Sequence, residues 1–164
     1  IISVKKGLKN EHGEIRGMLN ERVEIGKITL NNECGIYGEY DKECDLLNNR
    51  KEVFVASKNE IETGPATIYC SIDGDGVPKE YNINVVKKSD LIVIKIKGMI
   101  IEVTDEELLQ KTGGIIQGMS GSPILQNGKF IGAVTHVYVN DPTRGYAIFA
   151  ESMLEQLNEF DNKV

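Results

Sequence analysis

The chain has 164 residues, an ordinary apolar fraction of 40% and a net charge of −6, which suits one domain with a real core or two small barrels that share an interface. The negative charge argues against general nucleic-acid binding, which needs a basic face, and the longest apolar run falls far short of the ~18 residues that a membrane-spanning helix needs. The two histidines are isolated and no Cys-x-x-Cys pair occurs, so we expect neither a metal site nor a cofactor.

Residues 1–103 are predicted to form short strands separated by glycine turns, a spacing that suggests a β-sandwich or a β-barrel. The predicted strands are residues 1–6, 14–19, 27–30, 35–40, 53–57, 66–72, 80–87, 91–96 and 99–103. No signal peptide is present and the chain begins at Ile1 without a methionine, so we expect it to be a fragment of a longer protein.

A change of pattern at Thr104 predicts the first helix. Thr104 and Glu107 have the spacing of a capping box, so we expect a helix with Thr104 as its N-cap that ends before the glycines at 113–114. Further on, Asn127-Gly128 is a strong hairpin signal. The remaining elements are predicted as strands at residues 124–126, 130–139 and 146–149 and a terminal helix at 151–160.

Residues 118–123, with the sequence GMSGSP, combine the features that a serine nucleophile requires. Such a serine must project from a tight turn whose backbone N–H groups point to the same place, because these donors hold the oxyanion of the tetrahedral intermediate. Small residues let a substrate carbonyl approach the backbone closely. Composition alone would equally allow Ser120 to be an ordinary turn serine.

The stretch 118–137 resembles the nucleophile segment of chymotrypsin-fold serine proteases and aligns with it without a gap. The resemblance implies that Ser120 is the nucleophile and that the oxyanion site is formed by Gly118, Met119 and Ser120. Met119 stands where pancreatic-type enzymes have an aspartate that pairs with a new N-terminus. We therefore expect the start of this chain to form an inner strand and not an activating terminus.

The same alignment gives roles to three residues of the returning strand. Thr135 falls where such proteases keep a serine that supports the triad carboxylate, and His136 and Val137 fall on the edge strand that pairs with the substrate backbone. From the residues alone, Thr135 is equally well a β-branched residue in a half-buried strand, and His136 a partly buried aromatic on a sheet.

A more specific resemblance, covering most of the chain, is to the stage IV sporulation protein B (SpoIVB) peptidase family. It is carried by residues 104–105, 113–123, 134–137 and 139–143, with 2–7 and 13–17 near the start. It implies an all-β fold with short helices, a chymotrypsin-like double β-barrel. Residues 1–164 would then be one peptidase domain whose N-terminal barrel is incomplete.

The resemblance also implies a biological setting. These serine endopeptidases cut a regulator of an intramembrane protease, which then matures a sporulation sigma factor. They bind their protein substrate as an extended peptide, carry a preceding PDZ domain, and meet the membrane only through an N-terminal anchor. The implied location is the intermembrane space of a sporulating bacterium, reached by secretion across the forespore membrane.

The resemblance also concerns the triad partners of Ser120. The family's histidine lies in an upstream Ala-Leu-Gly-His-like motif that this chain lacks, so the resemblance implies that residues 1–164 alone are inactive. His12 is expected in an exposed loop, and His136 aligns with the substrate strand. The family acid maps onto Asp105, which could instead be an acidic residue in the first turn of a capped helix, where it suits the helix dipole.

Two further alternatives stay open. Besides a serine endopeptidase, the sequence allows a non-catalytic β-domain that binds an extended peptide by strand addition along residues 135–137. In an oxidising space Cys34 and Cys44 could form a disulfide bond. We expect buried free thiols instead, because Cys70 lies in an apolar strand and would be left over.

Overall fold

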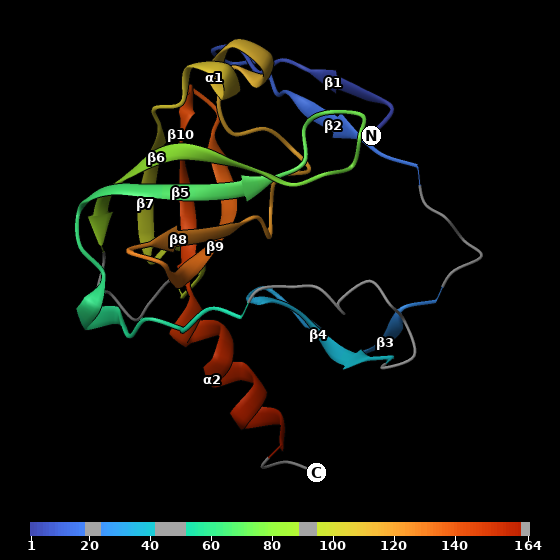
Figure 1. Cartoon of the computed structure of the whole chain (residues 1–164), viewed down its shortest axis with the longest axis vertical. Coiled ribbons are helices and arrows are strands. Elements are labelled where there is room, and N and C mark those ends of the chain that lie inside the picture. The colour runs from blue at the N-terminus through green and yellow to red at the C-terminus, as the bar shows by residue number, and fades with distance from the viewer. Residues whose placement is uncertain (19–23, 42–51, 89–94, 162–164) are drawn as a thin grey trace.

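Six antiparallel strands close into a barrel at the centre of the protein (Figure 1). The structure is a computed structural model and describes residues 1–18, 24–41, 52–88 and 95–161. Around the barrel the strands follow the order β10-β7-β6-β5-β8-β9, and β9 pairs with β10 to complete the ring. The six strands are β5 (Gly64–Cys70), β6 (Lys79–Lys88), β7 (Met99–Val103), β8 (Pro123–Gln126), β9 (Lys129–Tyr138) and β10 (Asp141–Phe149).

The barrel core is built by alternation of side chains along the strands. In β7, Met99, Ile101 and Val103 are buried and the two residues between them are only half-buried, as expected of a strand with one face turned inward. The largest side chains that are less than 2% exposed are Ile61, Ile68, Ile83, Met99, Ile101, Leu108, Met119, Ile124, Ile131, Ile148, Val85 and Val134. The mainly β fold class predicted from the sequence is confirmed.

The strands before β5 form two separate hairpins. The first pairs β1 (Ser3–Lys5) with β2 (Glu14–Arg16), and the second pairs β3 (Gly26–Asn32) with β4 (Gly35–Tyr40). In Figure 1 the first hairpin lies beside α1 (Glu106–Thr112) at one end of the barrel, and the second lies nearer α2 (Ala150–Asp161) at the other. In the part of the chain that the structure describes, only the C-terminal barrel is closed, as the sequence predicts.

The predicted N-cap of α1 is wrong by one residue. Asp105, not Thr104, caps the helix, and its carboxylate accepts a hydrogen bond from the Leu108 N–H. The reason lies in β6, because the N–H groups of Thr104 and Asp105 both donate to the Asn82 carbonyl, at 3.1 and 3.0 Å. Both residues are thereby held extended against β6, and the helix begins only after them.

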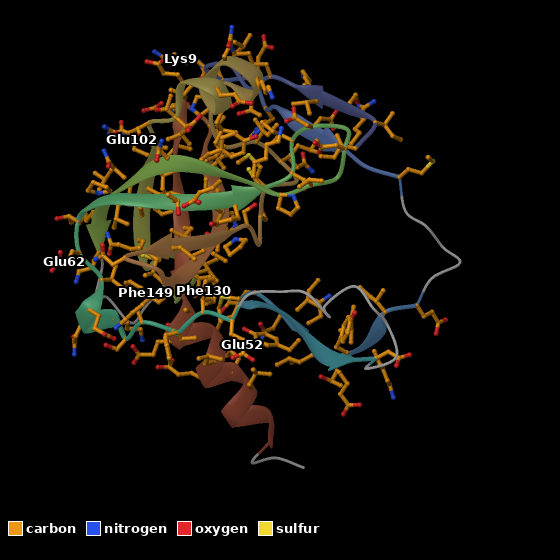
Figure 2. All side chains as sticks on the ribbon, in the orientation of Figure 1. Lys9, Glu52, Glu62, Glu102, Phe130 and Phe149 are labelled. Carbon is orange, nitrogen blue, oxygen red and sulfur yellow. The ribbon has the colours of Figure 1, made fainter. Side chains whose placement is uncertain are left out.

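One predicted strand, at 53–57, is reduced to a single bridge. Val55 forms a parallel bridge with Phe130 near the start of β9, where Figure 2 labels the phenylalanine. Ser57 instead precedes the 3₁₀ helix η2 (Lys58–Glu60), and its N–H donates to the Glu60 carboxylate at 2.9 Å. This capping pair competes with extension of the strand.

The predicted strand at 91–96 is also not found as such. Residues 91–94 lie outside the described residues, and Ile96 belongs to the 3₁₀ helix η3 (Lys95–Lys97). The other elements agree with prediction to within a few residues in the described ranges. At the β8–β9 turn both Asn127 and Gly128 have positive φ, 52° and 74°, as the predicted hairpin requires.

Two of the three cysteines lie in the described part of the chain. Cys34, between β3 and β4, is 5% exposed and packs with Ala133 and Ile148 of the barrel. Cys70 is buried at the end of β5 as a free thiol. Cys44 lies outside the described residues, so the choice between a Cys34–Cys44 bridge and free thiols stays a prediction.

Replacing Gly132 of β9 by alanine is expected to destabilise the barrel. A Cβ at this position would overlap the Ile148 carbonyl oxygen on β10 and lie 2.7 Å from Met99 Cε, and overpacking of this kind costs about 1–3 kcal/mol. Gly74→Ala is the matched control, since its Cβ would meet only the Ile1 carbonyl oxygen, at 3.8 Å. Urea denaturation should show a lower midpoint for Gly132→Ala alone; equal midpoints would contradict this close packing of β9 on β10.

Candidate active site

Ser120 lies in the turn that leads into β8, and its side chain is exposed. The Ser120 Oγ donates a hydrogen bond to the Thr135 carbonyl oxygen at 2.9 Å. Two backbone bonds tie the same turn to β9: Gly121 N–H donates to Val134 O at 2.8 Å, and Val134 N–H donates to Ser122 O at 3.0 Å. The hydroxyl is therefore held at a fixed place beside the second half of β9.

Two backbone donors next to Ser120 are unused. From residue 115 to residue 122, every N–H group donates to a described partner except those of Gly118 and Ser120, for which the described chain provides no acceptor. These two residues are exposed, on either side of the buried Met119. Folded chains pair nearly all buried backbone donors. Because Gly118 and Ser120 are exposed, their N–H groups can instead bond to solvent or to a ligand. Two N–H groups beside a serine hydroxyl are what an oxyanion hole requires.

Met119, which the resemblance also placed in the oxyanion site, has its own partners. Its N–H donates to Ile116 O at 3.1 Å, and its Sδ accepts from Ile116 N–H at 3.4 Å. The side chain is 1% exposed and packs into the barrel core. Met119 thus anchors the loop through uncharged contacts. Of the three predicted oxyanion residues, Gly118 and Ser120 keep an N–H without an acceptor in the described chain.

Strand β2 contacts the nucleophile loop, and the sequence did not predict this. The Gln117 N–H donates to Gly13 O at 3.0 Å, and the Ile15 N–H donates to Gln117 O at 2.8 Å. These bonds join distant parts of the chain through backbone atoms alone, so no side-chain pattern marks them. The glycine at position 13 is the one local trace, because a Cβ there would lie 2.5 Å from Ile116 Cγ2.

The three predicted residues of β9 lie beside Ser120. Thr135 provides the carbonyl that holds Ser120, while its own hydroxyl donates to Ile96 O at 2.8 Å, so within the described chain it bonds η3 and not a carboxylate. His136 is exposed and Val137 packs against the core. β8 pairs with β9 no further than Ala133. Beyond that point this edge of β9 has no strand partner among the described residues.

Asp105 lies at the N-terminus of α1, whereas Ser120 lies in the turn before β8. Its Oδ1 accepts from Leu108 N–H at 3.1 Å, and its Oδ2 accepts from the Asn82 N–H and Nδ2 at 3.1 and 3.4 Å. These bonds fix the carboxylate to α1 and β6, whereas Ser120 is fixed to β9. In the six-stranded order, β6 and β9 are three strands apart in either direction. No described hydrogen bond links the two side chains, so the implied triad role of Asp105 stays a prediction.

A largely apolar groove of about 840 Å³ has Gly121 and Ser122, which follow Ser120, among its lining residues. Strands β5, β6 and β8 supply most of the remaining lining. Cys70 also lines it, but burial, with a smaller effect from Asp105, raises the pKa of this thiol to about 11. A thiol with such a pKa stays protonated at neutral pH, so Cys70 contributes an uncharged thiol to the groove.

Two general features complete the description of the site. Among the described residues, no group of three or more histidine, cysteine, aspartate or glutamate side chains is arranged to hold a metal ion. In the same residues, no helix has the length and apolarity to cross a lipid bilayer.

Solved structures with a similar fold are proteases. The active form of the Rv3671c protease from M. tuberculosis matches with a TM-score of 0.55 and 16% identity, over 81% of this chain and 56% of that chain. The inactive form of the same protease matches with a TM-score of 0.53 and 15% identity, over 82% and 66%. The chain thus spans little more than half the length of the first structure. At these identities the likeness shows the fold, which is chymotrypsin-like.

No curated protein sequence matches the chain significantly. The family model described as SpoIVB peptidase S55 matches residues 1–154, nearly the whole chain and all of the barrel. The predicted family and the predicted chymotrypsin-like fold are therefore both confirmed. With a serine in a tight turn, two unused backbone donors beside it and this match, the chain belongs to the SpoIVB peptidase S55 family of serine peptidases.

Proposed function

We propose that this chain carries the nucleophile, the oxyanion hole and the substrate strand of a serine endopeptidase that works through an acyl-enzyme. The observation that carries the proposal is the pair of unused N–H groups, of Gly118 and Ser120, beside the exposed Ser120 hydroxyl. In this chemistry the serine oxygen attacks the peptide carbonyl, and the two donors stabilise the negative charge that develops on the carbonyl oxygen.

The general base is proposed to come from a histidine outside residues 1–164, as the family resemblance implies. A serine hydroxyl needs an adjacent base at neutral pH. In the described chain Ser120 donates to the Thr135 carbonyl, an acceptor that cannot take the proton away. Neither His12 nor His136 forms a described hydrogen bond with Ser120, and both are exposed. An imidazole that replaced Thr135 as the acceptor would activate the hydroxyl.

The substrate is proposed to bind as an extended peptide along residues 135–137 of β9. β10 covers one edge of this segment, and the other edge faces Ser120 without a strand partner in the described chain. Backbone hydrogen bonds to that edge would place a scissile carbonyl beside the nucleophile. The same edge supports the second candidate, a peptide-binding domain without catalysis, when the base is absent.

The biological role is a further part of the proposal. The enzyme would cut a regulator of an intramembrane protease and so allow sigma-factor maturation during sporulation. It would act in the intermembrane space after secretion across the forespore membrane, with a PDZ domain and a membrane anchor on the parent chain. Membership of the SpoIVB family supports this role.

Labelling with a fluorophosphonate tests the proposal directly. A form of the enzyme that includes the upstream histidine segment should be labelled on Ser120 and should cleave peptides, and Ser120→Ala should abolish both. Residues 1–164 alone should turn over negligibly, because an incomplete triad leaves about 10³–10⁴-fold acceleration over water. Normal turnover by residues 1–164, or an unlabelled Ser120 in the longer form, would contradict the proposal.

Two substitutions of Asp105 separate its possible roles. If Asp105 is the triad acid that the family resemblance implies, Asp105→Asn should keep the fold, since Asn is as good an N-cap as Asp, and should lower kcat by about 10⁴-fold. Asp105→Ala should also lower the unfolding free energy by about 1 kcal/mol. Unchanged kcat for Asp105→Asn would show that the contacts with Leu108 and Asn82 give Asp105 only the role of a helix cap.

The exposed histidine of β9 provides a third test. His136→Ala should raise KM more than it lowers kcat, because the residue belongs to the proposed substrate strand and makes no described bond to Ser120. Steady-state kinetics on a peptide substrate in the longer form of the enzyme measure the two constants separately. If kcat instead collapsed with KM unchanged, His136 would be the base.

A further inference from the structure

The peptide group between Gln117 and Gly118 is held by strand β2. The Ile15 N–H donates to Gln117 O at 2.8 Å, and the Gln117 N–H donates to Gly13 O at 3.0 Å. The loop residue therefore pairs with β2 as a single parallel bridge, opposite Glu14. This pairing involves the residue immediately before the first unused donor of the oxyanion site.

Peptide planarity converts this contact into a constraint on that donor. The Gln117 carbonyl and the Gly118 N–H belong to one trans peptide unit, in which the two groups point in opposite directions. With the carbonyl bonded to Ile15, the Gly118 N–H must point away from β2. If the peptide turned over, the carbonyl oxygen would take the place of the donor and would repel an oxyanion.

Side-chain packing restricts the same peptide from a second direction. Gly118 has a φ of +99°, and a Cβ at this position would lie 3.0 Å from Ile15 Cβ. A left-handed conformation of this kind is open to glycine but strained for other residues. Ile15 itself is half-buried and packs against the barrel core. The Ile15 side chain, which packs against the core, thus restricts the backbone at Gly118.

The hairpin that carries Ile15 is also bonded to α1 and to the turn between β9 and β10. The Gly7 N–H donates to Thr112 O, the last residue of α1, at 2.8 Å, and the Asn10 N–H donates to Val139 O at 3.0 Å. Close contact at Gly13 completes the fit, since a Cβ there would lie 2.5 Å from both Gly7 N and Ile116 Cγ2. The hairpin therefore packs closely against Ile116 as well as against the 117–118 peptide.

We infer that the β1–β2 hairpin is the positioning element of the oxyanion hole, with the Ile15 N–H as the positioning group. It holds the 117–118 peptide in the orientation that offers the Gly118 N–H to the substrate. Undocking of the hairpin would release this peptide and lower turnover without touching Ser120. The inference rests on the proposed function for its catalytic meaning. The contact between the hairpin and the 117–118 peptide is a property of the backbone and does not depend on that function.

Two variants disrupt the contact between the hairpin and the 117–118 peptide by different means. Gly13→Ala places a Cβ where Gly7 and Ile116 leave no room. Ile15→Pro removes the N–H that holds the Gln117 carbonyl. Gly17→Ala is the matched control, because it adds the same methyl group just after β2, at a position where no atom lies within 4 Å.

Kinetics in the active longer form of the enzyme should show a loss in kcat with little change in KM. Loss of one oxyanion donor costs about 10²-fold in kcat, and we expect a loss approaching this for both Gly13→Ala and Ile15→Pro. Fluorophosphonate labelling of Ser120 should slow in parallel. Gly17→Ala should match the wild type in all three measurements.

The rate of amide hydrogen exchange in residues 113–120 reports this contact independently of catalysis. Both variants should speed exchange in this peptide, with the barrel strands still protected, and Gly17→Ala should not. If both variants fold and match Gly17→Ala in exchange and in kcat, the positioning role is overturned. An unlabelled Ser120 in the wild type would overturn the proposed function, and with it the catalytic role of the hairpin contact. Faster exchange with unchanged kcat would show a loop anchor without a role in the oxyanion hole.

Discussion

The hydrogen bond between the Ile15 N–H and the Gln117 carbonyl is the constraint on which the site depends. An oxyanion hole needs backbone donors that the protein itself does not use, yet a loop without internal bonds would not hold them in place. Here the neighbours of Gly118 and Ser120 are all bonded, to β2, to β9, to β10 or within the loop. The two donors stay available because everything around them is fixed.

The barrel explains why β9 serves several purposes at once. Strand β8 pairs with β9 only as far as Ala133, just before the residues of β9 that lie beside Ser120. The carbonyl of Thr135 then accepts a hydrogen bond from the Ser120 hydroxyl, and the Thr135 hydroxyl ties the strand to η3. A strand that is paired on one edge and open on the other is both a rigid support and a place for an extended peptide.

The contacts that hold the loop of residues 115–122 in place are uncharged. Met119 fills the core position beside Ser120 and exchanges hydrogen bonds with Ile116 through its N–H and its sulfur. No ionisable side chain is among the described partners of this loop between residues 115 and 122. The orientation of the donors therefore does not depend on the titration of a nearby group, in contrast to a loop held by an ion pair with an N-terminus.

Local patterns in the sequence were sufficient for most of the fold. The Asn127-Gly128 turn, the alternation in β7 and the position of Ser120 depend on neighbouring residues, and each was predicted. The N-cap of α1 was displaced because Asn82, far away in sequence, holds Thr104 and Asp105 extended. In the same way no pattern could show that Gly13 and Ile15 bracket Gln117, because the contact uses backbone atoms, which every sequence carries.

A crystal structure of the active enzyme with Ser120 phosphonylated by a fluorophosphonate would test the oxyanion hole most directly. We expect a phosphonyl oxygen about 2.7–3.1 Å from the N atoms of both Gly118 and Ser120, with the Gln117 carbonyl still bonded to the Ile15 N–H. A phosphonyl oxygen held by other donors, or a 117–118 peptide turned so that the Gln117 carbonyl faces the adduct, would contradict this expectation.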